Sequence, residues 1–300
     1  MITEDAALIR RAAALRRDVF VLGQGVAPEI EADGRDDEAV HAVVERDGAV
    51  VGTGRLLEVD GEARLGRIAV DGSRRGEGLG AEVVRELEAA AAALGLPRLR
   101  LHAQQPVVGF YERLGWTVVG APDVEAGIAH RWMVRDLLPG LRPVADSDAE
   151  PLQALVGGCF AEYEGAVLEV DGLDAWMLRP ATDLAEKGAA LWVLPAGPDL
   201  AACCGWRVSG PGVVELKSLY VGAPWRRRGY AAALVGLVER AARDRDARTV
   251  ELWTDSRFHD AHRLYARLGY VRTAGTRDLH DRSRTTEHHV VKTLGVHRRG

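Results

Sequence analysis

Residues 68–80 read IAVDGSRRGEGLG, and residues 219–231 repeat the pattern as LYVGAPWRRRGYA. Each stretch is a short apolar segment, a polar turn and Arg-x-x-Gly-x-Gly/Ala before a predicted helix. A second motif is also present twice, as FYERLGW at 110–116 and LYARLGY at 264–270. Arg75 and Arg226 lie 151 residues apart, and Tyr111 and Tyr265 lie 154 residues apart. A repeat of this length predicts two copies of one domain.

The length of 300 residues fits two domains of ordinary size. The segment LLPGLRP at 137–143 interrupts the regular pattern with Pro and Gly. We therefore predict a first domain over 1–138 and a second over 141–300. Hydrophobic residues make up 47% of the chain and charged residues 28%, which is typical of a globular protein.

Hydrophobic periodicity predicts the same order of elements in both halves. In the first half, we expect helices over 8–17, 80–94 and 107–114, and strands over 40–44, 50–57, 63–70, 98–103, 116–120 and 128–134. In the second half, we expect helices over 147–163, 173–187, 229–243 and 259–268, and strands over 190–194, 200–208, 213–221, 249–254 and 290–294. Early antiparallel strands followed by strand–helix–strand units predict an α/β (α+β) fold with a mixed sheet in each half.

The repeated loop has the properties of an anion site. Glycines such as Gly78 and Gly80 remove side-chain bulk where a ligand must approach the backbone. The first amides of the following helix lack intrahelical partners, and the helix dipole adds positive potential. These features suit a pyrophosphate, and the arginines add charge-assisted contacts. We predict binding by two loops: Arg75, Gly76, Gly78, Leu79 and Gly80, and Arg226, Arg227, Arg228, Gly229, Tyr230 and Ala231.

With the downstream Tyr motifs, this arrangement resembles the GNAT superfamily, the acetyltransferases related to Gcn5. The resemblance implies two tandem acyl-CoA N-acyltransferase domains, and acetyl-CoA as cosubstrate. It implies that the fourth strand splays from the fifth and that its backbone binds the pantetheine, here at Ile68 to Val70 and Leu219 to Val221. It also implies that Tyr111 and Tyr265 are placed to protonate the leaving CoA thiolate.

The first half is similar to the ElaA/YjcF-type branch of this family. The similarity rests on VFV at 19–21, QGV at 24–26, GRIAV at 66–70 and EAGIAH at 125–130. That branch usually has Glu where this chain has Gly23. The second half is similar to a more general bacterial branch, through ELKSLYV at 215–221 and LWTD at 252–255.

Transfer to an amine requires a base that removes a proton from the amine. Several relatives carry a basic Glu on the fourth strand, at the position of Glu215. The first half has Arg64 there, and an arginine is not a base at neutral pH. We therefore predict that the second half catalyses acetylation of a primary amine by direct attack in a ternary complex. The first half is predicted to bind acyl-CoA without reacting, or to react differently.

Several alternatives remain open at this point. Gly76-x-Gly78-x-x-Ala81 also fits a dinucleotide fingerprint, although no acid ends the next strand near His102. Tyr111 and Tyr265 could be core aromatics, and Glu215 could be a strand-face ion pair. His259, His262 and the EHH run at 287–289 could suggest a metal, but we expect no metal because no further ligand pattern is present.

Composition bounds the partners. A net charge of −5 argues against nucleic acid, despite Arg226–Arg228. The opening residues MITEDAALIRRAA do not read as a signal peptide, no segment reads as a membrane span, and three cysteines suit a reducing compartment.

We expect a cytoplasmic bacterial enzyme with a small-molecule or peptide amine as acceptor, and a possible pseudo-dimer of the halves. Glu162, Glu164 and Asp255 would suit a cationic amine. The alternatives are another acyl group, or a non-catalytic acyl-CoA sensor or scaffold.

Overall fold

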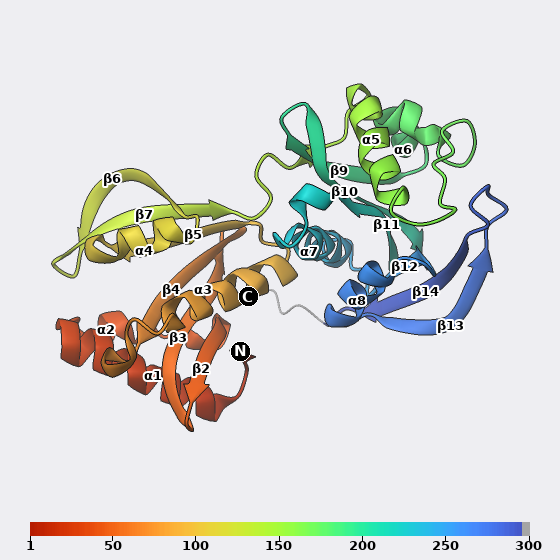
Figure 1. Ribbon diagram of the computed structural model, residues 1–300. Helices are drawn as coiled ribbons and strands as arrows, with labels where there is room; N and C mark the ends of the chain where they lie inside the picture. Colours follow the sequence, from red (N-terminus) through yellow and green to blue (C-terminus); the bar gives the residue numbers. More distant parts are fainter. Residues whose placement is uncertain (296–300) are drawn as a thin grey trace. The chain divides into compact units, whose positions relative to one another are not determined.

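The structure is a computed structural model that describes residues 1–295. The chain divides into two compact units, one containing Met1–Ala92 and Leu96–Leu137, and the other containing the described residues from Leu138 onward. Each unit is built around one seven-stranded mixed sheet (Figure 1).

The first sheet has the strand order β1-β2-β3-β4-β5-β7-β6. Its strands are β1 (Ile2–Thr3), β2 (Val40–Arg46), β3 (Ala49–Val59), β4 (Glu62–Val70), β5 (Arg98–Gln104), β6 (Thr117–Glu125) and β7 (Ile128–Asp136). Its helices are α1 (Ala6–Arg16), α2 (Pro28–Glu31), α3 (Leu79–Ala93) and α4 (Val108–Arg113). A π-helical segment, Arg17–Leu22, extends α1.

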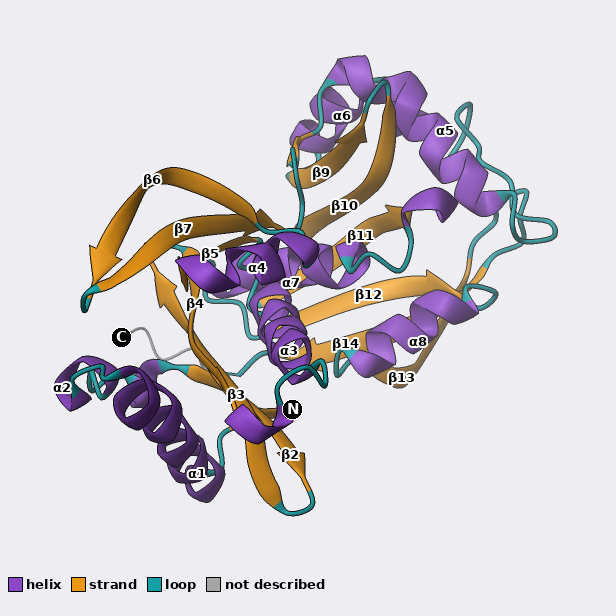
Figure 2. Ribbon diagram, turned by 60° about the vertical axis from the view of Figure 1, so that its left-hand side comes forward, coloured by secondary structure: helices purple, strands orange, loops and turns teal. Residues whose placement is uncertain are grey.

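Counted from β8, the second sheet runs β8-β9-β10-β11-β12-β14-β13, which is the same order. Its strands are β8 (Arg142–Pro143), β9 (Ala189–Ala196), β10 (Asp199–Gly210), β11 (Val213–Val221), β12 (Thr249–Asp255), β13 (Val271–Asp278) and β14 (Thr286–Thr293). Its helices are α5 (Ala149–Phe160), α6 (Pro180–Glu186), α7 (Tyr230–Arg243) and α8 (His259–Arg267). The predicted repeat of a mixed α/β sheet is therefore confirmed (Figure 2).

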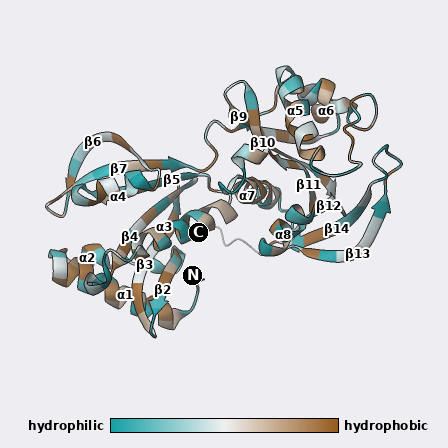
Figure 3. Ribbon diagram, viewed as in Figure 1, coloured by the Kyte–Doolittle hydropathy of each residue, from teal (hydrophilic) through white to brown (hydrophobic). Residues whose placement is uncertain are grey.

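The longer helices pack on the sheets through buried apolar residues, and their ribbons alternate between hydrophobic and hydrophilic positions (Figure 3). In the first unit, Val83 and Leu87 of α3 pack against the β3 face that contains Gly54. In the second unit, α5 buries Leu152 and Val156 in a cluster with residues of β9 and β10.

One predicted helix needs correction, and two elements were not predicted. The helix expected over 173–187 is a 3-10 turn, Ala175–Leu178, followed by α6, because Pro180 can only begin a helix. Strand β13 was not expected, since it alternates between exposed and half-buried residues and contains Gly275. The π-helical continuation of α1 was not expected either.

A network of charged side chains ties α1 and the loops after it to β3 and β4. The buried Arg16 donates to Glu31 (2.6 Å) and to Asp36, and the buried Arg55 donates to Asp33 and Asp36. We call this set, with Arg67, the ionic cluster: Arg16, Glu31, Asp33, Asp36, Arg55 and Arg67. Because each buried charge has a hydrogen-bonded partner, the cluster avoids the cost of an unpaired buried ion.

We predict that Gly54→Ala destabilises the first unit by about 1–3 kcal/mol through overpacking. An added Cβ would lie 2.8 Å from Val83 Cγ1 and 3.0 Å from Leu87 Cδ1. Urea unfolding followed by circular dichroism measures the change. Gly66→Ala, on β4, is the matched control because nothing lies within 4 Å of its added Cβ. An equal effect of both substitutions would contradict the packing argument.

The ionic cluster also predicts a pH dependence. The hydrogen bond from Arg55 lowers the pKa of Asp33 to about 2. A folded-state pKa below the unfolded value of about 3.9 stabilises the fold above pH ~4, and this contribution is lost as the pH falls toward 2. We expect Asp33→Asn to lower the urea midpoint at pH 6 and to make it less sensitive to acid between pH 4 and 2. Asp37→Asn, at an exposed neighbour, should have neither effect.

Candidate functional site

The first repeat loop presents the start of a helix at the end of β4. A 3-10 turn, Gly72–Arg74, is followed by extended Arg75, and then Gly76 and Gly78 adopt positive φ angles of 88° and 81°. Helix α3 begins directly afterwards, at Leu79. Residues 75–78 are exposed. The free amides at the start of α3 are therefore accessible to an anion.

The second loop has the same shape after β11. A 3-10 turn, Ala223–Trp225, is followed by extended Arg226, and then Arg227 and Gly229 adopt φ angles of 63° and 85°. Helix α7 begins at Tyr230. Arg227 occupies the left-handed position that Gly76 holds in the first loop, at a cost of roughly 1–2 kcal/mol. The loop geometry is thus kept even where the glycine is not.

The arginines of the two loops have different surroundings. Arg75 is exposed. Arg226 donates from Nε to the Val221 carbonyl (2.9 Å) and from both terminal nitrogens to Glu162 (2.6 Å each). The bond to Glu162 raises the pKa of Arg226. Glu162 would therefore compete with a phosphate for Arg226, whereas Arg75 has no such competitor in the described chain.

The fourth and fifth strands separate after a short stretch of parallel pairing. In the first unit, Ala63–Leu65 pair with Leu99–Leu101, and the pairing then ends. In the second unit, the last pair is Glu215 with Glu251. The backbone of the fourth strand beyond this point, which includes the predicted pantetheine-binding residues, faces the gap instead of a neighbouring ladder. The predicted splay is confirmed in both units.

The two tyrosines lie on equivalent short helices. Tyr111 belongs to α4 and Tyr265 to α8, and their exposed fractions are 7% and 5%. Each helix ends before a glycine with positive φ, Gly115 or Gly269. Burial raises the pKa of both hydroxyls, so each tyrosine holds its proton at neutral pH, as a proton donor must.

Glu215 lies at the base of the gap in the second unit. Its side chain is 4% exposed and accepts a hydrogen bond from Arg207 Nε at 2.6 Å, with Lys217 Nζ at 3.5 Å. The ion pair considered from sequence is therefore present. Arg64, at the matching position of the first unit, is exposed.

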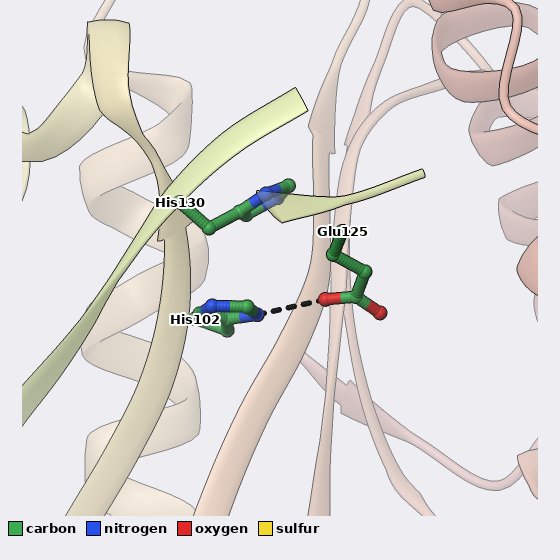
Figure 4. Close-up of side chains that lie close together, drawn as sticks. All are labelled: His102, Glu125 and His130. Atoms are coloured by element: carbon green, nitrogen blue, oxygen red, sulfur yellow. Dashed lines mark hydrogen bonds and ion pairs between the residues drawn. The ribbon is translucent and has the colours of Figure 1, made fainter. Parts of the chain in front are cut away.

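A group of polar residues near the gap of the first unit was missed by the sequence argument. His102 on β5 contacts Glu125 through Nδ1 at 2.7 Å (Figure 4). It also contacts Asp123 through Nε2 at 2.7 Å. Ligand atoms of His102, Glu125 and His130 lie within 4.8 Å of one another, close enough to be considered as metal ligands. The available signal was His102 on an alternating strand and the EAGIAH hairpin, but only the fold brings them together.

The other candidates from sequence are separated or already bonded. His262 contacts the Asp255 carbonyl, and His289 contacts Glu251. Two of the acids considered for a cationic amine are already ion-paired: Glu162 with Arg226, and Asp255 with Arg257. Gly23 closes the π-helical segment, and the next residue, Gln24, accepts a hydrogen bond from Gln104 at the end of β5.

Comparison with known proteins decides the family. The model of the acetyltransferase (GNAT) family matches residues 12–116 and 157–270, one match in each half. The chain belongs to the GNAT acetyltransferase family. An acyl-CoA cosubstrate follows from this membership, and the dinucleotide alternative does not apply.

The first half is similar to single-unit relatives. The uncharacterised N-acetyltransferase YjcF of Bacillus subtilis is 36% identical over 137 residues, which are 45% of this chain and 98% of YjcF. YyaT of the same organism is 34% identical over 139 residues, 45% of this chain and 93% of YyaT. The crystal structure of Escherichia coli ElaA is 25% identical, with a TM-score of 0.41, and the match covers 45% of this chain and all of ElaA. The predicted resemblance of the first half is confirmed.

Within the described residues, no helix has the length and apolar character needed to cross a membrane.

We predict that one chain binds two acyl-CoA molecules, one at each loop. Gly78→Val and Gly229→Val should each reduce the stoichiometry in calorimetric titration with CoA from two to one, because valine is strained at positive φ and covers the amides. The double variant should not bind. Gly48→Val, also at positive φ but in the turn between β2 and β3, is the control. A stoichiometry of one in the parent chain would contradict the prediction that the loops of both units bind CoA.

Proposed function

We propose that the chain transfers an acetyl group from acetyl-CoA to a primary amine of a small molecule or peptide, and that the second unit catalyses this step. The observation that carries the proposal is the position of Glu215. It is a buried, ion-paired carboxylate in the last pair before β11 and β12 separate, whereas the first unit has Arg64 at that position.

In this proposal the acceptor amine attacks the thioester carbonyl directly. Amides of β11 in the gap polarise the carbonyl oxygen, which is stabilisation of developing charge by fixed donors. Glu215 accepts the proton from the amine, directly or through water. The bond from carbon to sulfur breaks, and Tyr265 gives its proton to the departing CoA thiolate. The products are the amide and CoA thiol.

The support for Tyr265 is its environment. Burial raises the pKa of Tyr265, so its phenol is protonated at neutral pH. Tyr265 lies on α8, the helix that follows the gap-lining strand β12. The ring of Tyr270 lies 5.7 Å away and belongs to the turn after the helix.

We predict that Glu215→Gln lowers kcat for acetylation of an amine panel by about 10²–10⁴-fold while calorimetric affinity for CoA stays within twofold. Arg207→Gln, which keeps the carboxylate and removes its Nε partner, should retain most of kcat. CoA thiol release is the readout. If both variants lose the same activity, Glu215 has only a structural role. If no amine yields CoA thiol with the parent chain, the protein is an acyl-CoA sensor or scaffold instead.

We also predict that Tyr265→Phe lowers kcat without weakening CoA binding, because the leaving thiolate then has no positioned proton donor. Tyr270→Phe is the control for removal of a nearby phenol and should leave kcat unchanged. The same amine panel and thiol assay serve for both. Equal rates for Tyr265→Phe and the parent would exclude the proposed acid.

A further inference from the structure

Two arginines lie side by side near the gap of the first unit. Arg64 on β4 and Arg100 on β5 are direct partners in the parallel pairing, one residue before its last pair. Both guanidinium groups lie over the ring of Trp132, with centroid distances of 5.3 Å and 4.3 Å. The ring holds two positive charges close together on one face of the sheet.

This face is the one opposite α3. Gly54 packs against α3, so Arg55, the next residue, points to the other face. Arg55 pairs with Gly66 across β3 and β4, and Arg64 lies two residues from Gly66 on the same strand. Arg64 and its neighbour Arg100 therefore share the face that α1 covers farther along the sheet.

Neither arginine has an anionic partner within residues 1–295. Arg64 and Arg100 form no ion pair there, and Arg100 Nε is a buried atom without a hydrogen bond. Adjacent like charges in a sheet repel each other. By contrast, the arginines of the ionic cluster in the same unit all have carboxylates. The pair at Arg64 and Arg100 thus lacks the anions that the ionic cluster supplies to its arginines.

The nearby carboxylates are already occupied. His102 stacks on Trp132 (4.3 Å, 14° between ring planes), and its two ring nitrogens contact Glu125 and Asp123. Glu125 and Asp123 are therefore held by His102 and not by the two arginines.

The second unit reverses the charge at the same place. Arg64 and Arg100 each lie 151 residues before a glutamate, and these glutamates, Glu215 and Glu251, are also parallel partners. The histidine and tryptophan of the stacked pair have also changed places: Trp253 is on β12, and it stacks on His289 of β14 with ring centroids 4.6 Å apart. The backbone is repeated, but its charged side chains are not, so the two units present different surfaces to an acceptor.

We propose that Arg64 and Arg100 bind the carboxylate of an acceptor that carries both a carboxylate and a primary amine. A guanidinium fork matches a carboxylate with two parallel hydrogen bonds, and two forks above one ring can hold both oxygens. The site lies at the start of the gap, so the amine of such a molecule reaches toward the thioester. This goes beyond the proposed function, because it concerns the unit that the proposal leaves without a base.

The test uses the full chain with Glu215→Gln and Tyr265→Phe, saturated with CoA. The probes are α-, β- and γ-amino acids, each paired with its carboxamide, which differs only by lacking the negative charge. Binding is measured by calorimetry, which does not require turnover. We expect at least one amino acid to bind at least 10-fold more tightly than its carboxamide. Arg64→Gln with Arg100→Gln should abolish that difference.

Three controls keep the result specific. Arg85 is exposed on α3, at the opposite face of the sheet, so Arg85→Gln should preserve the preference for the amino acid. The double variant with Arg64→Lys and Arg100→Lys keeps both positive charges and should retain part of the preference for the amino acid. A stoichiometry of two CoA molecules in each variant shows that the first unit is folded. Equal binding of acid and amide, no binding of any probe, or a preference that survives the glutamine pair would each overturn the proposal. Thiol release by the parent second unit tests the proposed function separately.

Discussion

The site in each unit depends on a parallel strand pair that stops early. A left-handed residue interrupts the fourth strand, Arg67 (φ 54°) in the first unit and Ser218 (φ 51°) in the second. The register against the third strand shifts at the same place. The pairing with the fifth strand ends just before this bulge, at Leu65 and at Glu215, and the phosphate loop follows at the end of the fourth strand. The end of the pairing, the bulge and the loop therefore occur in the same order along the fourth strand of both units.

The two units hold that irregularity with different side chains. Arg67 donates to the backbone carbonyls of Ile30 and Glu31, and so joins the bulge to the ionic cluster. At Ser218 the carbonyl accepts a hydrogen bond from Cys203 Sγ (3.2 Å), a residue inside the apolar cluster under α5. Burial raises the pKa of this thiol, which therefore stays protonated and acts as a small core residue. The same strained backbone is stabilised by ion pairs in one unit and by apolar packing in the other.

Sequence reasoning succeeded where the determinant is local. The strand, turn and glycine pattern of each loop and the Gly that ends each Tyr helix are set by residues within a few positions, and they predicted the elements that line the gap. It failed at β13, where half-exposed residues give no apolar alternation, and at 173–187, where Pro180 divides the expected helix. It also missed the bond of Arg226 to Glu162, 64 residues away, and the approach of His102 to Glu125, because long-range pairing decides both.

The division of labour between backbone and side chains explains why two copies can share a fold and differ in chemistry. The acyl-CoA elements are main-chain elements: a splayed strand, a loop with two left-handed residues and a helix start. The second unit has Arg227 at the position equivalent to Gly76, and the loop keeps its shape. An acceptor, by contrast, meets the side chains beside the gap, where Arg64 in one unit corresponds to Glu215 in the other. Charge at that position can change without altering the cosubstrate site, so a duplicated unit can acquire a second acceptor while it retains the first reaction's cosubstrate.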